Sequence, residues 1–151
     1  MMKEFSTVGS LSGQYKSKLE IETLVFSSMQ SGQVERTYGL KITVQTSDNS
    51  YPKDGTCLID QDELTELSDG LRYLDDKLMQ LSTGVQNYTE LQYVTRDGFR
   101  IGFFVNPGPS PNPTVFCSVP TSDSAFMPSV RLSQIRELIQ KGQEVLNQLA
   151  F

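Results

Sequence analysis

The chain has no histidine and only two cysteines among its 151 residues. Without histidine, catalysis by a Ser-His-Asp or Cys-His arrangement is excluded, and the usual ligand of zinc, copper and non-haem iron is missing. Cys57 and Cys117 belong to no C-x-x-C motif or metal-ligand cluster, so they are either two buried thiols or a single bridge between distant segments. We therefore expect no enzyme, no cofactor and no metal site.

Long apolar runs and phosphate-binding loops are also missing. No apolar run approaches the roughly 20 residues that a membrane-spanning helix needs, and neither G-x-G-x-x-G nor G-x-x-x-x-G-K-[ST] occurs. Asp60-Gln61-Asp62 begins like a calcium loop, but Leu64 and Thr65 stand where a ligand and a glycine are required. The sequence predicts a soluble, cytoplasmic protein with no membrane partner.

Positive charge is in short supply. Thirteen lysine and arginine residues are outnumbered by eighteen aspartate and glutamate residues, which gives a net charge of −5. This background repels a partner that is held mainly through its phosphates. Nucleic acid therefore stays an alternative partner that the net charge disfavours.

What the sequence does contain is two similar halves. A chain of this length buries one core. We expect a single domain over residues 18–151, made of halves at 18–83 and 86–151, after a flexible leader or extra strand at 1–17. In each half, runs that alternate apolar and polar residues, which is typical of strands, precede an amphipathic helix.

The apolar stripes of the two helices have the same spacing of three, four, three and four residues. Their members are Leu64, Leu67, Leu71, Leu74 and Leu78 in the first helix, and Ile135, Leu138, Gly142, Val145 and Leu149 in the second. Leu64 and Ile135 are 71 residues apart, whereas Gly39 and Gly98, in the strand regions, are 59 apart. The predicted fold class is α+β: a duplicated unit of antiparallel β-hairpin, strand and helix, with two long helices packed on antiparallel sheet.

Capping residues mark where each helix is expected to begin. Asp60 and Glu63 form a pattern like a capping box before the first helix, and Ser133 is the expected N-cap of the second.

The order of elements resembles a known group of proteins. With Gly55-Thr56-Cys57-Leu58-Ile59-Asp60-Gln61-Asp62-Glu63-Leu64 leading from strand into helix, the unit looks like the PC4 transcriptional-coactivator fold, and its tandem repeat looks like the Whirly family. The lysine-rich signature of the Whirly proteins is absent. The resemblance implies binding of single-stranded DNA on a sheet face.

The basic residues available for such a face are few: Arg36, Lys41, Arg96 and Arg100. Single-strand binding also needs aromatic side chains on which bases stack. By strand alternation, the neighbouring Tyr38 and Phe99 lie on the opposite face from Lys41 and Arg100, which favours a core position for both rings.

The function that we predict is a non-enzymatic interaction or scaffold protein that forms a homo-oligomer or binds a protein partner. The final helix has a wide apolar arc, which suggests an association surface at Ile139, Leu146 and Phe151. Two alternatives stay open: a single-stranded nucleic-acid-binding protein of the PC4 or Whirly type, and a small-molecule-binding module with a pocket between helix and sheet.

Overall fold

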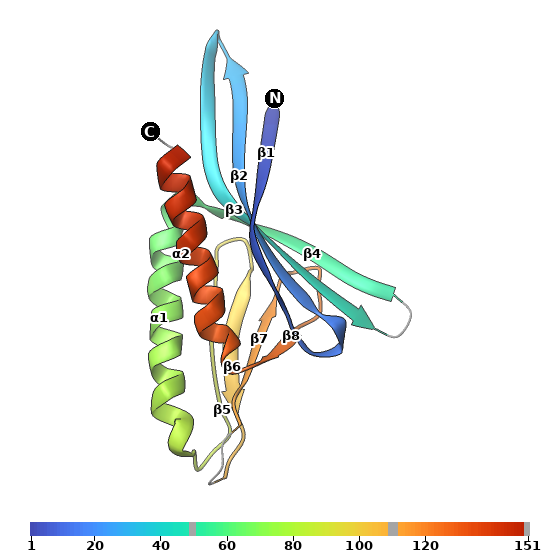
Figure 1. Ribbon diagram of the computed structural model, residues 1–151, viewed down its shortest axis with the longest axis vertical. Coiled ribbons are helices and arrows are strands. Elements are labelled where there is room, and N and C mark those ends of the chain that lie inside the picture. The colour runs from blue at the N-terminus through green and yellow to red at the C-terminus, as the bar shows by residue number, and fades with distance from the viewer. Residues whose placement is uncertain (49–50, 109–111, 150–151) are drawn as a thin grey trace.

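The computed structural model describes residues 1–48, 51–108 and 112–149, and it contains two four-stranded antiparallel sheets and two helices (Figure 1). The first sheet holds its strands in chain order: β1 (Met2–Ser12), β2 (Lys18–Gln30), β3 (Gln33–Asp48) and β4 (Tyr51–Asp60). A short 3₁₀ turn, Gln61–Glu63, leads from β4 into helix α1 (Leu64–Gln80).

The second sheet is also ordered sequentially and is followed by the second helix. Its strands are β5 (Thr89–Val94), β6 (Arg100–Val105), β7 (Thr114–Ser118) and β8 (Ala125–Pro128), and helix α2 spans Arg131–Leu149. The predicted α+β class with antiparallel sheets and two helices is confirmed. No helix in the described ranges is long and apolar enough to cross a membrane.

Strand alternation decides which side chains enter the core. On β2 and β3, Leu19, Ile21, Leu40 and Ile42 are fully buried, and the residues between them point to the opposite face. Phe99 and Phe103 are the largest fully buried side chains of the second sheet region. Both cysteines are buried free thiols, so no bridge joins them.

Each helix contacts the sheet of the other half of the chain. Helix α1 lies against β5 and β6, whereas α2 lies against β1, β2 and β3, and the two helices contact each other (Figure 1). The helices are also joined by an ion pair between Arg136 Nη1 and Asp75 Oδ2 at 3.3 Å. The crossed arrangement makes one connected core out of both halves.

The buried stripe of α2 differs from the predicted one. Its buried members are Leu132, Ile135, Ile139, Gly142 and Leu146. Leu138 and Val145, which we expected in the stripe, are only half-buried, and Leu149 is 48% exposed. Two overlapping apolar stripes are present on this helix, and the packing against the first sheet selects the one that the sequence did not favour.

The helix starts also differ from the predictions. Ser133 lies inside α2, and its hydroxyl donates to the carbonyl of Val130 at 3.0 Å, so it is not the N-cap. No side-chain capping bond is formed at Asp60. Both predictions were wrong: Ser133 bonds to a carbonyl three residues earlier, and Glu63, the expected partner of Asp60, bonds to Arg96 instead.

The offset of 59 residues does not relate equivalent strands. Gly39 lies in β3, the third strand of its sheet, whereas Gly98 lies in the turn before β6, the second strand of its sheet. Strand β8 is only four residues long. There, Ala125 and Met127 are buried while Phe126 and Pro128 are exposed, as in a strand with one face inward.

Candidate functional site

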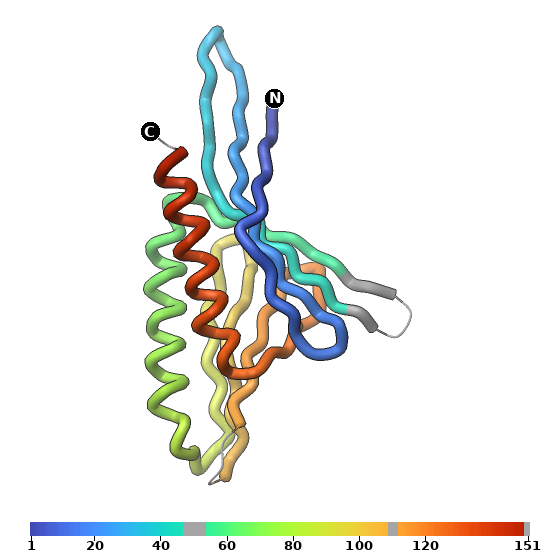
Figure 2. Tube along the Cα trace, in the orientation of Figure 1, coloured from blue at the N-terminus to red at the C-terminus, as the bar shows by residue number. Residues whose placement is uncertain are grey.

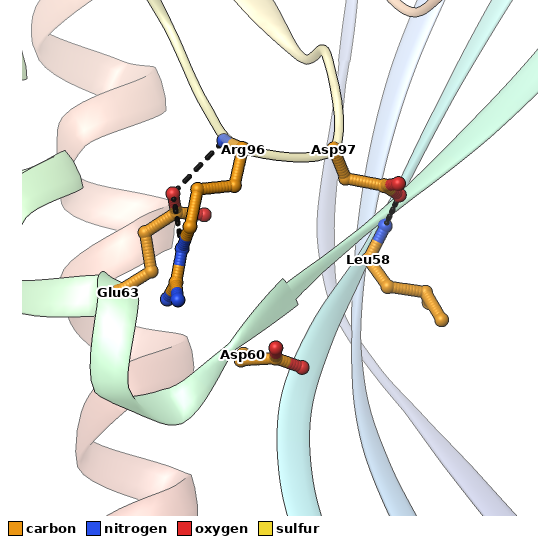
Figure 3. Close-up of a pocket in the computed structure, with 5 residues that line it drawn as sticks. All are labelled: Leu58, Asp60, Glu63, Arg96 and Asp97. Carbon is orange, nitrogen blue, oxygen red and sulfur yellow. Dashed lines mark hydrogen bonds and ion pairs between the residues drawn. The ribbon is translucent and has the colours of Figure 1, made fainter.

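The turn between β5 and β6 is attached to the end of β4 (Figure 3). The Asp97 carboxylate accepts a hydrogen bond from the backbone N–H of Leu58 at 2.8 Å, and the Cys57 thiol donates to the Asp97 carbonyl at 3.2 Å. Gly98 has a φ of 92°, a conformation that favours glycine, so the turn is tight enough to present Asp97 to β4.

Arg96, the other side chain of this turn, is held by two carboxylates. Glu63, only 3% exposed, accepts from the backbone N–H of Arg96 at 2.9 Å and from its Nε at 3.0 Å, as Figure 3 shows. Asp62 accepts from Nη2 at 2.7 Å. These bonds raise the pKa of Arg96 and lower the pKa of Asp62. Arg96 is therefore engaged within the chain.

We call this set of contacts the latch, made of Leu58, Asp62, Glu63, Arg96 and Asp97. A pocket of about 320 Å³ lies beside it, lined by four of these residues and Asp60. In the pocket wall, Glu63 bonds to Arg96 and Asp97 bonds to the Leu58 N–H, so the first role of these groups is to join β4 and α1 to the second sheet. No group of three or more metal-ligating side chains lies together in the part of the chain that the structure describes.

The four basic residues that we predicted as a nucleic-acid face do not lie on one face. Lys41 is in β3 of the first sheet, and its Nζ lies 3.9 Å from Glu22 and 4.8 Å from the ring centre of Phe5. Arg36 is five residues earlier in β3, on its opposite face, and Arg100 is in β6 of the second sheet. The prediction of a shared face is wrong because it joined residues of different sheets.

Arg100 does share a face with aromatic residues, though not the two named from the sequence. Tyr88, Phe104, Phe116 and Phe126 form a cluster on the outer face of the second sheet, which we call the aromatic face. Ring centres of Tyr88, Phe116 and Phe126 lie 6.1, 6.4 and 6.3 Å from that of Phe104. Tyr88 is 53% exposed and Phe126 38% exposed.

Strand register explains how the aromatic face forms. Gly102 pairs with Phe116, which in turn pairs with Phe126, and Phe104 is two residues beyond Gly102 on the same side of β6. Arg100 lies two residues before Gly102, so it occupies the other end of this face. The ion pairs of the described residues use Lys18, Lys41, Arg96 and Arg136, and Arg100 is in none of them.

A second uncovered region is the outer part of the first sheet. The β2–β3 hairpin and the start of β1 extend past the helices (Figures 1 and 2). We call this three-stranded ribbon the arm: Met2–Ser6, 24–30 and 33–38. All of its β1 residues and residues 33–37 are exposed, including Phe5 at 46% and Val34 at 60%.

The predicted association surface on the last helix is wrong for two of its three residues. Ile139 and Leu146 are fully buried in the core of the chain, because the wide apolar arc of α2 packs against the first sheet and α1. Phe151 lies outside the described residues. The arm and the aromatic face are two regions where several apolar side chains are exposed together, among them Met29 and Val34 on the arm and Phe126 on the aromatic face.

Neither a protein-family model nor a curated protein matches this chain. The geometry of the latch, the aromatic face and the arm therefore carries the functional argument.

Proposed function

We propose that the protein is a non-enzymatic interaction protein that self-associates through the arm. The observation that supports this proposal is a three-stranded ribbon with both faces in solvent at its tip. A ribbon of this kind gains stability when a hydrophobic face is covered. The exposed apolar residues of the arm are Met2, Phe5, Met29 and Val34.

Charge favours a second copy as the partner. The arm contains two basic residues, Lys3 and Arg36, and two acidic ones, Glu4 and Glu35. The excess negative charge of the chain therefore lies outside the arm, and two arms approach each other with little net repulsion. We place the protein in the cytoplasm, a proposal with which two buried free thiols are compatible.

The test is the oligomeric state of the full chain by sedimentation velocity over a concentration series. We expect a dimer that weakens at least about tenfold in Kd, or about 1.4 kcal/mol, when Phe5 is changed to serine. Met79→Ser is the control, because Met79 is 70% exposed on α1, away from the arm. A wild-type chain that stays monomeric at high concentration would refute the proposal.

We infer further that the two ββββα units arose by duplication, as the resemblance to the Whirly family implies. Support comes from an offset of 68 residues at the last strand and helix. It relates buried Cys57 and Ile59 to Ala125 and Met127, and relates the stripe of α1 to that of α2, Leu64 to Leu132 onward. The same offset relates Gly70, which contacts Tyr93, to Leu138, which contacts Gly9.

A second candidate function is the binding of single-stranded nucleic acid on the aromatic face. Base stacking on exposed rings contributes roughly 1–3 kcal/mol per base, and Arg100 on the same face would supply a phosphate contact. Titration with labelled single-stranded DNA at two salt concentrations tests it. Arg100→Ala and Phe126→Ala should each weaken binding, whereas Arg72→Ala on α1 should not. Absence of binding at low salt would exclude this function.

A further inference from the structure

Strand β1 has an unpaired edge along the arm. The order of the first sheet places β1 at its border, with β2 on one side only. A register shift interrupts the β1–β2 ladder between Thr7 and Gly9. Before this bulge, Met2–Thr7 are all exposed. After it, Gly9 lies against the Leu138 side chain of α2. The free edge is therefore the six-residue segment before the bulge.

An exposed edge presents unpaired backbone N–H and C=O groups, which another strand can bind. Lys3 and Glu4 are the charged residues of this edge segment. Charges on an edge discourage most registers of pairing, because like charges directly opposite each other are destabilising. The same charges select among the registers available to two identical strands.

We propose that two copies of this chain pair β1 with β1, antiparallel and centred on Phe5, so that two first sheets become one continuous sheet of eight strands. This inference rests on the proposed self-association through the arm. A twofold axis perpendicular to the sheet puts the same sheet face of both copies on one side. Two residues that lie opposite each other across the axis must then point to the same face, so their residue numbers differ by an even number.

Only a few centres satisfy this symmetry within the free edge. A centre at Lys3 or Glu4 places two lysines or two glutamates directly opposite each other. A centre at Ser6 leaves only residues 5–7 to pair before the bulge, whereas a centre at Phe5 leaves residues 3–7. With Phe5 at the centre, Lys3 lies opposite Thr7 and Glu4 opposite Ser6 of the second copy, so no like charges are directly paired.

The Phe5-centred register also joins apolar surfaces. Phe5 pairs with Leu24 of β2 inside one chain, and Phe26 pairs with Lys3, whose Nζ lies 5.8 Å from the Phe26 ring centre. Across the twofold axis, the two Phe5 rings would stand side by side, flanked by Leu24 of each copy. The 46% of Phe5 that is exposed in one chain would then be largely covered.

Variants of the full chain with one added cysteine test this register. Under mild oxidation, a mixture of the Glu4→Cys and Ser6→Cys chains is expected to form a covalent dimer at least about tenfold faster than either chain alone, because a disulfide needs Cα atoms within about 7 Å. Both variants keep Phe5 at the centre of the proposed pairing. Cys57 and Cys117 are buried, and the unsubstituted chain measures their background.

The outcomes separate the two proposals. If sedimentation shows a dimer that depends on the arm but the mixture of Glu4→Cys and Ser6→Cys chains cross-links no faster than either chain alone, the register is wrong and self-association stands. Preferential cross-linking between Phe5→Cys and Val34→Cys chains would instead indicate β1–β3 pairing and also overturn the register. If no dimer forms in the unsubstituted chain, both proposals fail.

Discussion

On the first sheet, the covering helix α2 meets β1 at a glycine, whereas on the second sheet α1 meets β5 at a tyrosine. A β-carbon added to Gly9 would lie 2.6 Å from Leu138 Cδ2, and one added to Gly70 would lie 2.6 Å from Tyr93 Cδ2. In one contact the small residue is on the strand, and in the other it is on the helix. In both contacts a glycine therefore makes room for a large side chain, but the strand supplies the glycine in one contact and the helix supplies it in the other.

The outer faces of the two sheets differ in charge as well. On the first sheet, lysines pair with carboxylates, as in the contacts of Lys18 with Glu20 and of Lys41 with Glu22. On the second sheet, aromatic rings pack on one another. Two sheets with the same strand order therefore carry different outer surfaces, because the solvent-facing residues are not constrained by the core.

The largest expected effect comes from truncating one core position in each sheet. Phe103 of β6 is fully buried, and Phe103→Ala should lower the free energy of unfolding by about 3–5 kcal/mol. Thr23 of β2, which pairs with Leu40 as Phe103 pairs with Val115, is 2% exposed and bonds to the Ser6 carbonyl at 3.3 Å. Thr23→Ala should cost only about 1 kcal/mol. Urea unfolding measures both, and equal losses would contradict the expectation that the cost rises with the buried apolar volume that is removed.

The next largest effect is expected at the latch, because its hydrogen bonds join the two sheets. Glu63→Ala removes a buried acceptor of two hydrogen bonds from Arg96 and should cost about 1.5–3 kcal/mol. Asp62→Ala is the matched control: Asp62 bonds to the same arginine but is exposed, so its loss should change stability little. Urea titration of both variants checks this, and equal effects would show that burial of Glu63 is unimportant.

A smaller effect tests whether the Gly70–Tyr93 contact can be converted into the Gly9–Leu138 arrangement. Gly70→Leu should overpack against Tyr93 and cost about 1–3 kcal/mol, less the gain of about 1 kcal/mol in helix propensity. Tyr93→Gly alone should also destabilise. The double variant reproduces the Gly9–Leu138 arrangement and should be more stable than the two separate losses predict. Additive losses in this double-mutant cycle would show that the two contacts are not equivalent.

The sequence predicted the parts of the fold that depend on local pattern. All five leucines of the first stripe are buried on α1, and alternation correctly placed Phe99 in the core. Which apolar residues of α2 are buried could not be predicted from the sequence. One helical face contains Leu138 and Val145, the other contains Ile139 and Leu146, and the two are equally apolar. Distant residues such as Gly9 and Leu40, which contact α2, decide between them.

The candidate surfaces were harder to predict than the core. The aromatic face brings together Tyr88, Phe104, Phe116 and Phe126, from a loop and three strands, and strand register makes the three phenylalanines neighbours. Its β8 member was missed because a four-residue strand ending in proline gives little alternation. The arm could not be predicted either, since alternation in β2 and β3 does not show where the covering helix ends.

The smallest effect concerns the two buried thiols, Cys57 of β4 in the first sheet and Cys117 of β7 in the second. Burial raises the pKa of Cys117 to about 12, and burial together with the Asp97 carboxylate raises the pKa of Cys57 to about 11, from 9.0. A raised pKa in the folded state means that the contribution of the thiol to the free energy of unfolding is complete below pH 9.0 and is lost as the pH rises from there toward 11 or 12.

Asp97→Asn keeps an oxygen acceptor for the Leu58 N–H but removes the negative charge. It should therefore lower the pKa of Cys57 and leave that of Cys117 unchanged, as thiolate absorbance in single-cysteine backgrounds would measure. An equal shift at both thiols would show that the latch charge does not act locally on β4.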